Sequence, residues 1–583
     1  MNRALNIRLS VAAAIMFSGL PLLAQSSVAT KVISDQILPK DTYFYMSVPS
    51  MVRLKEVLSD SSVGQLYNDP AMDAFKAEVS TAFRSELDEG LARVQEALGV
   101  TLAEFLEIPA GEISMAVSAV PGNAMGMVIF VDFGENGSRV QGLLDRATDG
   151  LANAPKLQQD NTSFDGTELT MFRVQFEGPA PSPLVKEFGW FTKDERLVIS
   201  NREELLQFVL TNWDGGSERN FQQNEAYSYV LNRCQSGDRT ALTTFFIDPI
   251  GLFTKLVQTG SLGQRASMGA GMALGFLPTL GLTQLKAIGA VSEAGSGDFE
   301  GVSRSIAYCE QPPMALMQVF QLDQVDPVPP QWVKDNVTAY MSINWKVQEA
   351  FQAIESLVDM FSGAGAFAER LNQLADRPPG IHLRHDIVEQ LTGEIRFMTA
   401  PGTTNQFGGD QLLVALGVLN DTSADEVLGK IAGAAGMESR DFRNTRLYEV
   451  EGPQDGQSFG VCVTDGKLLL GMGTELLEQC IRNDADATPL AESDDFRRIA
   501  QHFPSNVLAV NFSRPAQQYR SIYELLRSGT AAEQFPGSDE IFEKVDFTTL
   551  PPFEVIEKYI HPAGGYSVAD DNGVFTQGFQ LKE

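Results

Sequence analysis

The sequence predicts an α+β protein made of two tandem homologous domains, each a mostly antiparallel sheet covered by helices. Three observations predict this. The segment from Gly189 to Leu210 matches the segment from Gly460 to Ile481 without a gap. Strand-like runs are joined by tight turns, which favour antiparallel pairing. Apolar residues at helical spacing fill the stretches between them. Units of this length are whole domains, whereas solenoid repeats measure roughly 20 to 50 residues.

Further matches occur in the same order along the chain. Three motifs return: Tyr45-Met46-Ser47-Val48 as Tyr340-Met341-Ser342-Ile343, Gly111-Glu112-Ile113 as Gly393-Glu394-Ile395, and Thr167 with Leu169 as Thr445 with Leu447. We therefore expect a signal peptide over 1–29, a first repeat domain over 30–311, a Pro-rich linker over 312–331 and a second repeat domain over 332–583.

The N-terminus has the pattern of a secretory signal peptide. Arg3 and Arg8 precede an apolar run from Leu9 to Ala24, and small residues follow. Cleavage is expected after Ala24 or after Ala29, and an uncleaved anchor is the alternative. No Cys follows the run directly, so no lipid anchor is indicated. We expect a secreted or periplasmic protein without an integral membrane span after cleavage.

The composition limits the class of partner. The chain has 583 residues with 75 acidic and 44 basic side chains, and its net charge is −31. This charge repels phosphate backbones, so nucleic acid is not an expected partner. The hydrophobic content of 43% is that of a packed globular protein. An extracytoplasmic ligand or protein is the expected partner.

The first domain is predicted to open with a strand over 43–48, followed by a short helix that Ser50 caps. Asp69 and Pro70 resemble a helix cap with Pro at the first helical position. Apolar residues then recur at spacings of three and four and predict a long amphipathic helix. They are Met72, Phe75, Val79, Phe83, Leu87, Leu91, Val94 and Leu98.

A strand, helix and hairpin series follows in each domain. In the first domain it consists of strands over 113–117 and 126–133, a helix over 140–151, a hairpin that turns at 193–196, and a helix carrying Leu205, Leu206, Val209 and Leu210. In the second domain the hairpin turns at Asp465-Gly466, a strong turn signal. The chain ends in a hairpin around Asn572-Gly573, and the run over 301–309 occupies the matching place in the first domain.

The Gly-rich stretch over 268–291 is the other apolar region. Gly, Pro278 and Lys286 interrupt it before it reaches the length of a membrane span. We interpret it as a buried or mobile element of the first domain. The glycines over 260–275 match no phosphate-binding loop, so no nucleotide cofactor is expected.

Several motifs together carry a resemblance to a family of secreted bacterial proteins with a duplicated domain of unknown function. The motifs are Leu38-Pro39-Lys40-Asp41, Ser342-Ile343-Asn344-Trp345, Leu391-Thr392-Gly393-Glu394, Leu550-Pro551-Pro552-Phe553, Gly564-Gly565-Tyr566 and Gly578-Phe579-Gln580-Leu581. The resemblance covers most of the mature chain. It implies export and a duplicated fold, and it supplies no catalytic residues.

The residues 456–460 match the G-x-S-x-G nucleophile pattern around Ser458. That elbow requires a strand before the Ser and a helix directly after it. Here the residues after Ser458 predict a strand, and Glu187 stands at the equivalent position of the first repeat. We therefore predict that Ser458 is not a nucleophile and expect no catalytic residue.

Other polar residues were weighed as sites. His382 and His385 lack a third spaced ligand, so a solvated pair is predicted in place of a zinc site. Glu112 and Glu394 are repeated acids beside a Gly at a strand start, and a turn or edge role is favoured over that of a general base. The weak candidates for extracellular Ca²⁺ ligands are Asp484, Asp486, Asp494 and Asp495.

Four cysteines, Cys234, Cys309, Cys462 and Cys480, are disulfide candidates because an exported chain meets an oxidising compartment. Cys462 and Cys480 replace Phe191 and Val209 of the first repeat. A strand residue and the apolar face of the next helix could face each other at these positions in both domains. Buried thiols are the alternative.

These patterns predict a non-enzymatic exported protein that acts in binding, as a scaffold or in association with the envelope. One alternative is a carrier of a hydrophobic ligand beneath a mobile Gly/Met-rich element over 268–280. Another is a hydrolase with an unrecognised carboxylate site, which convergent carboxylates with shifted pKa values would indicate.

Overall fold

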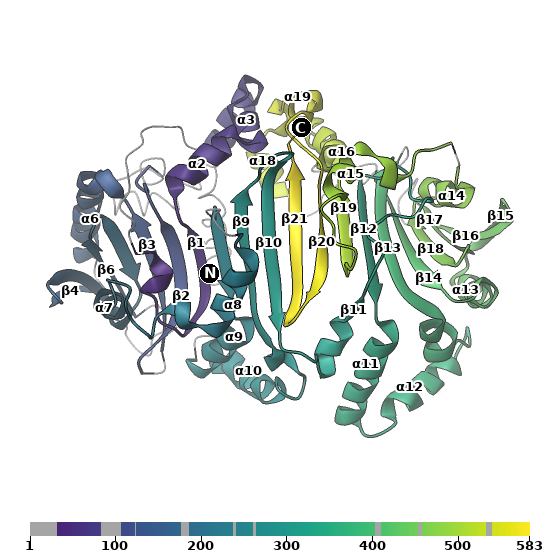
Figure 1. Cartoon of the computed structure of the whole chain (residues 1–583), viewed down its shortest axis with the longest axis horizontal. Helices are drawn as coiled ribbons and strands as arrows, with labels where there is room; N and C mark the ends of the chain where they lie inside the picture. Colours follow the sequence, from purple (N-terminus) through teal and green to yellow (C-terminus); the bar gives the residue numbers. More distant parts are fainter. Residues whose placement is uncertain are drawn as a thin grey trace. The chain divides into compact units, whose positions relative to one another are not determined.

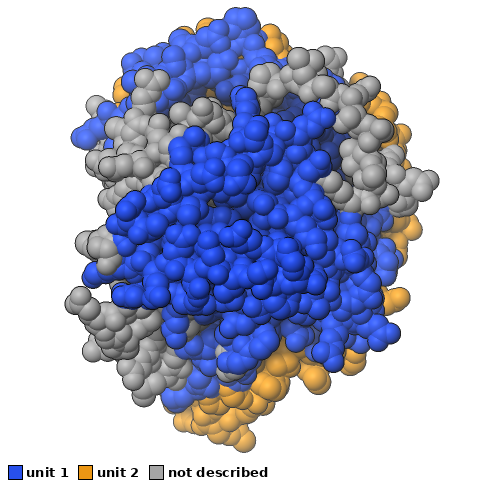
Figure 2. All heavy atoms as spheres, turned by 90° about the vertical axis from the view of Figure 1, so that its left-hand side faces the viewer, with its two compact units in different colours: residues 1–274, 286–294, 543–549 blue, residues 275–285, 295–542, 550–583 orange. Residues whose placement is uncertain are grey.

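The computed structural model describes residues 32–582, except 83–106, 123, 155, 176–185, 237–240, 261–263, 403–409, 453–457, 485 and 532–538. The chain forms two compact units, which are coloured separately in Figure 2. Unit 1 comprises Met1–Leu274, Lys286–Ala294 and Glu543–Thr549. Unit 2 comprises Gly275–Leu285, Gly295–Phe542 and Leu550–Glu583. Both units are mixed α and β structures with antiparallel sheets (Figure 1).

The sheet of unit 1 follows the order β4-β5-β6-β7-β3-β2-β1-β8-β9, with every neighbouring pair antiparallel. The strands are β1 (Thr42–Val48), β2 (Ile113–Val120), β3 (Ala124–Asp132), β4 (Leu157–Phe164), β5 (Thr167–Val174), β6 (Glu187–Lys193), β7 (Arg196–Ser200), β8 (Thr243–Ile247) and β9 (Leu285–Ala294).

The sheet of unit 2 follows the order β15-β16-β17-β18-β14-β13-β12-β19-β20-β21-β10, again antiparallel throughout. The strands are β10 (Phe299–Cys309), β12 (Ala339–Trp345), β13 (Leu391–Pro401), β14 (Asp410–Val418), β15 (Glu438–Phe442), β16 (Thr445–Glu451), β17 (Ser458–Thr464), β18 (Lys467–Met472), β19 (Ala509–Ser513), β20 (Ala563–Asp570) and β21 (Gly573–Leu581). A short strand, β11 (Leu322–Asp323), pairs with the end of β12.

Helices cover both faces of the unit 1 sheet. The helices and helical turns before residue 277 are η1 (Ser34–Gln36), α2 (Met51–Asp60), α3 (Ser62–Asn68), η2 (Pro70–Met72), η3 (Gly134–Asn136), α6 (Gly137–Ala152), α7 (Glu203–Thr211), η5 (Phe221–Gln223), α8 (Glu225–Cys234), α9 (Pro249–Gln258) and α10 (Gln264–Phe276). Trp190 packs in the cluster beneath α6, whereas the next residue, Phe191, points to the other face and meets Trp213. Strand alternation therefore gives each helix its own apolar layer.

The later helical segments are η6 (Leu282–Gln284), η7 (Ala315–Phe320), α11 (Val347–Ser362), α12 (Ala366–Ala375), η8 (Leu383–Ile387), η9 (Val388–Gln390), α13 (Asp421–Ala435), α14 (Glu475–Arg482), η10 (Leu490–Glu492), α15 (Asp494–Ala500), α16 (Pro515–Arg527), α18 (Asp539–Lys544), η11 (Phe547–Thr549) and α19 (Phe553–Glu557). The main core of unit 2 lies between the sheet and helices α14 and α15, with Leu477 and Phe496 among its members.

Many sequence-predicted elements are present with their caps. Ser50 accepts a hydrogen bond from the Arg53 amide, and Asp69 caps the turn that Pro70 begins. The predicted hairpins are β2–β3, β6–β7, β17–β18 and β20–β21. The predicted long helix is observed from residue 73 to residue 82, and its continuation to Leu98 lies outside the described residues.

The stretch over 268–291 differs from the single element expected. It forms the end of α10, the turn η6 and most of β9, and residues 275–285 belong to unit 2. Met272 of α10 is 72% exposed. The expectation was a buried or mobile element, and its buried form is wrong for α10, because glycines and small residues give this helix no continuous apolar face to bury. Its mobile form stays a prediction.

Candidate functional site

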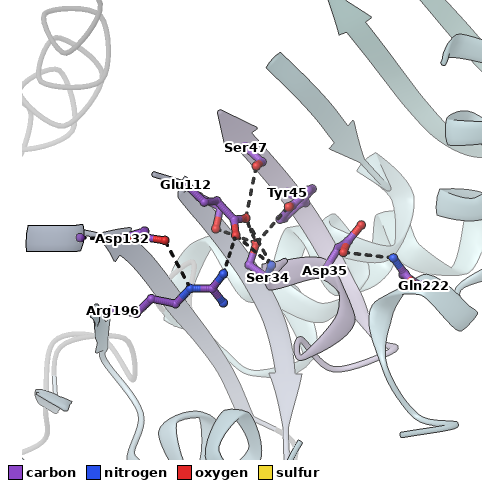
Figure 3. Close-up of polar contacts among 10 residues, drawn as sticks. Ser34, Asp35, Tyr45, Ser47, Glu112, Asp132, Arg196 and Gln222 are labelled. Atoms are coloured by element: carbon purple, nitrogen blue, oxygen red, sulfur yellow. Dashed lines mark hydrogen bonds and ion pairs between the residues drawn. The ribbon is translucent and has the colours of Figure 1, made fainter. Parts of the chain in front are cut away.

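A buried polar cluster lies within unit 1, where segments distant in the sequence converge (Figure 3). The turn η1 supplies Ser34 and Asp35, and Glu112 stands directly before β2. The other members are Tyr45, Ser47, Ser114, Asp132, Arg196, Gln222 and Tyr227. Grouped carboxylates and tyrosines in a low-dielectric setting are typical of active sites.

The local sequence explains how the strands present these groups. In β1, Tyr45 and Ser47 are two residues apart and therefore share one face. Ser47 lies opposite Ser114 of β2. Gly111 matters because a Cβ atom there would lie 2.6 Å from the carboxylate of Asp132. The glycine thus permits the close approach of β3 to the start of β2.

Glu112 is the central acceptor of the cluster and is 4% exposed. The Ser34 amide donates to its Oε2 at 3.1 Å, and the Ser34 hydroxyl donates to its Oε1. The Ser47 hydroxyl donates to Oε1 at 3.4 Å. Burial raises the pKa of Glu112, while the hydrogen bonds from Ser34 and the charge of Arg196 oppose that rise.

Ser34 connects the carboxylate to its neighbours. Its hydroxyl receives a hydrogen bond from Ser114 Oγ at 2.7 Å and lies 3.0 Å from the Tyr45 hydroxyl. While Glu112 is ionised, the Ser34 hydroxyl proton points to its carboxylate and the Tyr45 hydroxyl donates to Ser34. Once Glu112 is protonated, its own proton is donated to Ser34 Oγ and the Ser34 hydroxyl donates to Tyr45. The pKa of Tyr45 is raised well above its usual value by burial and by the nearby carboxylates.

Asp35 forms the second anchor of the same turn and is 3% exposed. The Tyr227 hydroxyl donates to its Oδ2 at 2.9 Å, and the Gln222 amide donates to its Oδ1 at 3.2 Å. Burial raises the pKa of Asp35, and these hydrogen bonds oppose the rise. The Tyr227 ring stacks on Phe221 at a centroid distance of 3.9 Å, so an aromatic pair packs beside Asp35.

Arg196 is the cation of the cluster and is 5% exposed. Its guanidinium nitrogens lie 3.9 Å from Glu112 Oε2 and 3.9 Å from Asp132 Oδ2. Both separations are too long for hydrogen bonds, and Nε has no partner among the described residues. Arg196 therefore acts on the two carboxylates through charge attraction, and it does not fully neutralise the acids around it.

The geometry shows that this cluster closes a segment onto the sheet. Ser34 is 0% exposed and Tyr45 is 2% exposed, so substrate has no access to Glu112 in this conformation. The groups that would do chemistry are instead bonded to the chain's own residues. The arrangement holds η1 against β1, β2 and α8.

A second feature is exposed and apolar. It consists of α11 and α12 of unit 2, which pack against each other (Figure 1). Four large apolar side chains on these helices are exposed by 37 to 56%: Ile354, Met360, Phe361 and Leu374. The Asp359 carboxylate accepts the amides of Gly365 and Phe367, each at 2.8 Å, and fixes the turn between the helices. We call this surface the exposed helix pair.

Phe276 extends the exposed helix pair. Its ring meets the ring of Phe361 at a centroid distance of 5.5 Å in an edge-to-face arrangement, and Phe276 is itself 45% exposed. Aromatic rings that contact each other and remain exposed to water form an apolar patch of the kind found at interaction sites. Phe276 itself lies in the region over 268–280 that the sequence singled out.

The two repeated acids have different environments. Glu112 is buried in the cluster above, so a turn or edge role does not describe it; the acid lies at the strand start but points inward. Glu394 is 45% exposed and binds Arg396 at 2.9 Å. The sequence paired these acids correctly in register but could not show which one faces the interior.

The other candidates fall in separate places. Ser458 begins β17, as predicted, and its carbonyl accepts the Gly473 amide at 2.8 Å. The imidazoles of His382 and His385 stack at 4.4 Å, and His385 Nδ1 lies 3.0 Å from Glu389. Both histidines lie in or beside the helical turn η8.

The proposed calcium ligands do not form one loop. Asp494 and Asp495 lie in the first turn of α15, and Arg514 Nε donates to Asp495 at 3.2 Å. Asp494 binds Arg497 at 3.1 Å, while Asp484 accepts the Asp486 amide. Within the described residues, no group of three or more His, Cys, Asp and Glu residues is placed to hold a metal ion.

The cysteines were predicted at the right elements. Cys462 lies on β17 and Cys480 on α14, and both belong to the same apolar cluster of unit 2. The structure holds all four cysteines as buried thiols. Burial raises the pKa of Cys462 and that of Cys480 to about 12 each. A disulfide between these two residues stays a prediction.

Ser34, Asp35, Asp132, Arg196 and Tyr227 were not singled out from the sequence. For Asp132 and Arg196, which lie on β3 and β7, the sequence signal is a polar residue at an inward strand position. Such a signal becomes visible once strand pairing is known, for example where Arg196 lies opposite Asp132 in the β3–β7 pair.

The described helices include none with both the length and the apolar character that a membrane span requires. Comparison with protein-family models, with curated proteins and with solved structures gives no match to this chain.

Proposed function

We propose that the protein is exported and acts by binding a partner protein through the exposed helix pair. The observation that carries this proposal is the group of exposed side chains Ile354, Met360, Phe361 and Leu374 on two adjacent helices. Single exposed apolar residues are ordinary, but large ones gathered on neighbouring elements are typical of interaction surfaces.

The charge of the surface selects the chemistry of the partner. Helices α11 and α12 carry the acids Glu349, Glu355, Asp359 and Glu369, and their only basic residue is Arg370. The whole chain has a net charge of −31. A partner segment that is both apolar and basic would therefore be attracted, because complementary charge speeds encounter and apolar contact supplies the affinity. An amphipathic helix rich in Leu and Lys has this chemistry.

The test uses two synthetic amphipathic helical peptides, one built from Leu and Lys and one from Leu and Glu. Fluorescence anisotropy with the full chain should show binding of the basic peptide only. Met360→Ser with Phe361→Ser should weaken that binding by about 30-fold, because central apolar contacts carry about 2 kcal/mol. Val63→Ser on α3 is the matched control, since Val63 is also exposed. Equal binding of the basic peptide by the unchanged chain, the Met360→Ser/Phe361→Ser variant and the Val63→Ser control would contradict the proposal.

We also infer that the two units are copies of one domain and that the resemblance to secreted bacterial proteins with such a duplication is real. The strand orders given above support this inference, since each strand from β1 to β9 has a counterpart from β12 to β20 in the same place of its sheet. Export rests on the sequence over 1–29. Fractionation of cells that produce the chain, with and without Leu9→Arg in the apolar run, tests that step.

A hydrophobic carrier is the second candidate, and Met272 with Phe276 favours it because these exposed side chains belong to the 268–280 element. A fluorescent fatty acid would distinguish it: saturable binding at one molecule per chain that Phe276→Ser abolishes supports a carrier. The hydrolase alternative predicts labelling by a serine-reactive fluorophosphonate that Ser458→Ala removes. The described carboxyls of Glu112 and Asp35, whose pKa values are raised, are closed from solvent.

A further inference from the structure

The segment Ile33–Leu38, which we call the strap, runs over the buried polar cluster of unit 1. Its residues Ser34, Asp35, Ile37 and Leu38 are all at most 3% exposed, while Ile33 at its start is 39% exposed. The Phe221 amide donates to the Leu38 carbonyl at 2.9 Å, and the Lys40 backbone amide donates to the Arg219 carbonyl at 2.8 Å. The strap thus has an apolar end fixed by backbone bonds and a polar end fixed by Glu112, Tyr227 and Gln222.

The polar end of the strap is held by two buried acids, Asp35 and Glu112, which is unusual for a purely structural contact. Asp35 and Glu112 lie among Tyr45 of β1, Ser114 of β2 and Tyr227 of α8, with Arg196 of β7 and Asp132 of β3 beyond. The Arg196 guanidinium lies 3.9 Å from Glu112 and 3.9 Å from Asp132 without a hydrogen bond to either, and Asp35 forms no ion pair with any described residue. Two charged acids in this setting would repel each other and lose solvation.

Unit 2 shows that the fold does not need these acids. There the Leu490 amide donates to the Val333 carbonyl at 2.9 Å, and the Asp335 amide donates to the Thr488 carbonyl at 2.9 Å. These two bonds reproduce the two backbone bonds of the strap. Counting back from Val333, Pro329 and Pro330 stand where unit 1 has Ser34 and Asp35. Prolines fix the chain without any titratable group.

We propose that the strap is a proton-controlled latch, seated on unit 1 when Asp35 and Glu112 carry protons and released when both ionise, so that a polar pocket lined by Tyr45, Glu112, Arg196 and Tyr227 opens. Release solvates Asp35 fully and admits water to Glu112. The seated strap binds more protons than the released strap.

The sign of the pH dependence follows from the burial of the two acids. Their pKa values are raised in the seated state. The seated form is therefore most populated at low pH and loses population as the pH rises from the ordinary carboxyl range through the raised values. Each acid contributes a change of up to about tenfold per pH unit in the ratio of seated to released strap within that window. Tyr45 and Tyr227 stay neutral throughout, because burial raises their pKa values well above 10.

The experiment places a spin label on Ile33→Cys in the full chain, where the exposed side chain allows labelling without contact with the cluster. The buried native thiols, with pKa values near 12 for Cys462 and Cys480, react slowly. Label mobility is recorded from about pH 4 to pH 8, where carboxyls with raised pKa values titrate. The mobile fraction should rise with pH.

Three variants make the test specific. Glu112→Gln and Asp35→Asn keep the shape but remove the titration, so each should reduce the steepness of the profile and the double variant should abolish it. Glu394→Gln, at the equivalent position of unit 2, should leave it unchanged. An immobile label at every pH, or a double variant that retains the full pH dependence, would overturn the proposal. If the double variant fails to fold, the two single variants decide.

Discussion

Units 1 and 2 share a strand order but use the same location differently. Glu112 stands directly before β2 and Glu394 lies near the start of β13, and Ser114 and Arg396 lie two residues further on. In unit 1 the acid points into a buried cluster. In unit 2 the Arg396 side chain fills the inner position, bonds to Glu394 at 2.9 Å and draws that acid to the surface. The comparison teaches that this scaffold tolerates either an inward acid or an inward arginine.

Residues on the neighbouring strands also differ between the two units. Register places Asp132 opposite Arg196 in unit 1 and Gly417 opposite Lys467 in unit 2. Unit 2 therefore has a glycine at the place of Asp132 and a lysine at the place of Arg196, and its inward cation, Arg396, pairs with Glu394. The differences are therefore correlated across three strands, as expected when a buried charge must be balanced by its neighbours.

The largest effect is expected at the aromatic residue that receives the strap. Phe221→Ala should lower the stability of unit 1 by about 4 kcal/mol, because this fully buried ring contacts Tyr45, Tyr227 and Phe246. Leu490→Ala, at the equivalent place, should cost unit 2 about 3 kcal/mol. Chemical denaturation followed by hydrogen exchange assigns each loss to its unit. If Phe221→Ala destabilised unit 2 alone, Phe221 and Leu490 would not hold equivalent places in the two units.

The repeated acids should differ sharply. Glu112→Ala leaves the Ser34 amide and Arg196 buried without their acceptor and should cost about 3 kcal/mol. Glu394→Ala removes a partly exposed ion pair and should cost under about 1 kcal/mol. Denaturation midpoints at about pH 5, where the strap is seated, measure both. Comparable losses at the two positions would show that the inward and outward placements are not energetically distinct.

Strand β10 lies near the boundary between the two units in the sequence, and its mutation tests which unit it stabilises. Val302 lies on β10 before the Pro-rich segment, yet it packs in the core cluster of unit 2 with Phe579. Val302→Ala should destabilise unit 2 by about 2 kcal/mol and leave the exchange of β1 and β2 amides unchanged. Loss of protection in β1 and β2 alone would instead assign β10 to the energetics of unit 1.

The smallest effect concerns the cysteine pair that replaces Phe191 and Val209. In the native reduced protein at pH 8, Cys462 and Cys480 should label with iodoacetamide far more slowly than in denaturant, because their thiols are buried and protonated. Mass spectrometry of the denatured, unreduced protein isolated from cells then tests the disulfide. Two labelled peptides, one for each thiol, would remove it and leave the packing between β17 and α14 intact.

Local sequence determined much of the fold. The Asp465-Gly466 turn joins β17 to β18, Ser50 caps α2, and Asn572-Gly573 joins β20 to β21. These features were predictable because turn geometry and capping depend on a few neighbouring residues. Gapless similarity between the two halves also placed Cys462 on a strand and Cys480 on the following helix.

Only the tertiary structure decided the inward direction of Glu112 and its partnership with Ser34, which is 78 residues away in sequence. It likewise decided that β10 pairs with β21 and that α11 and α12 leave Phe361 in contact with water. Such features depend on which strands become neighbours and which faces are covered. A polar residue at a strand start looks the same in sequence whether packing later encloses it or leaves it in solvent.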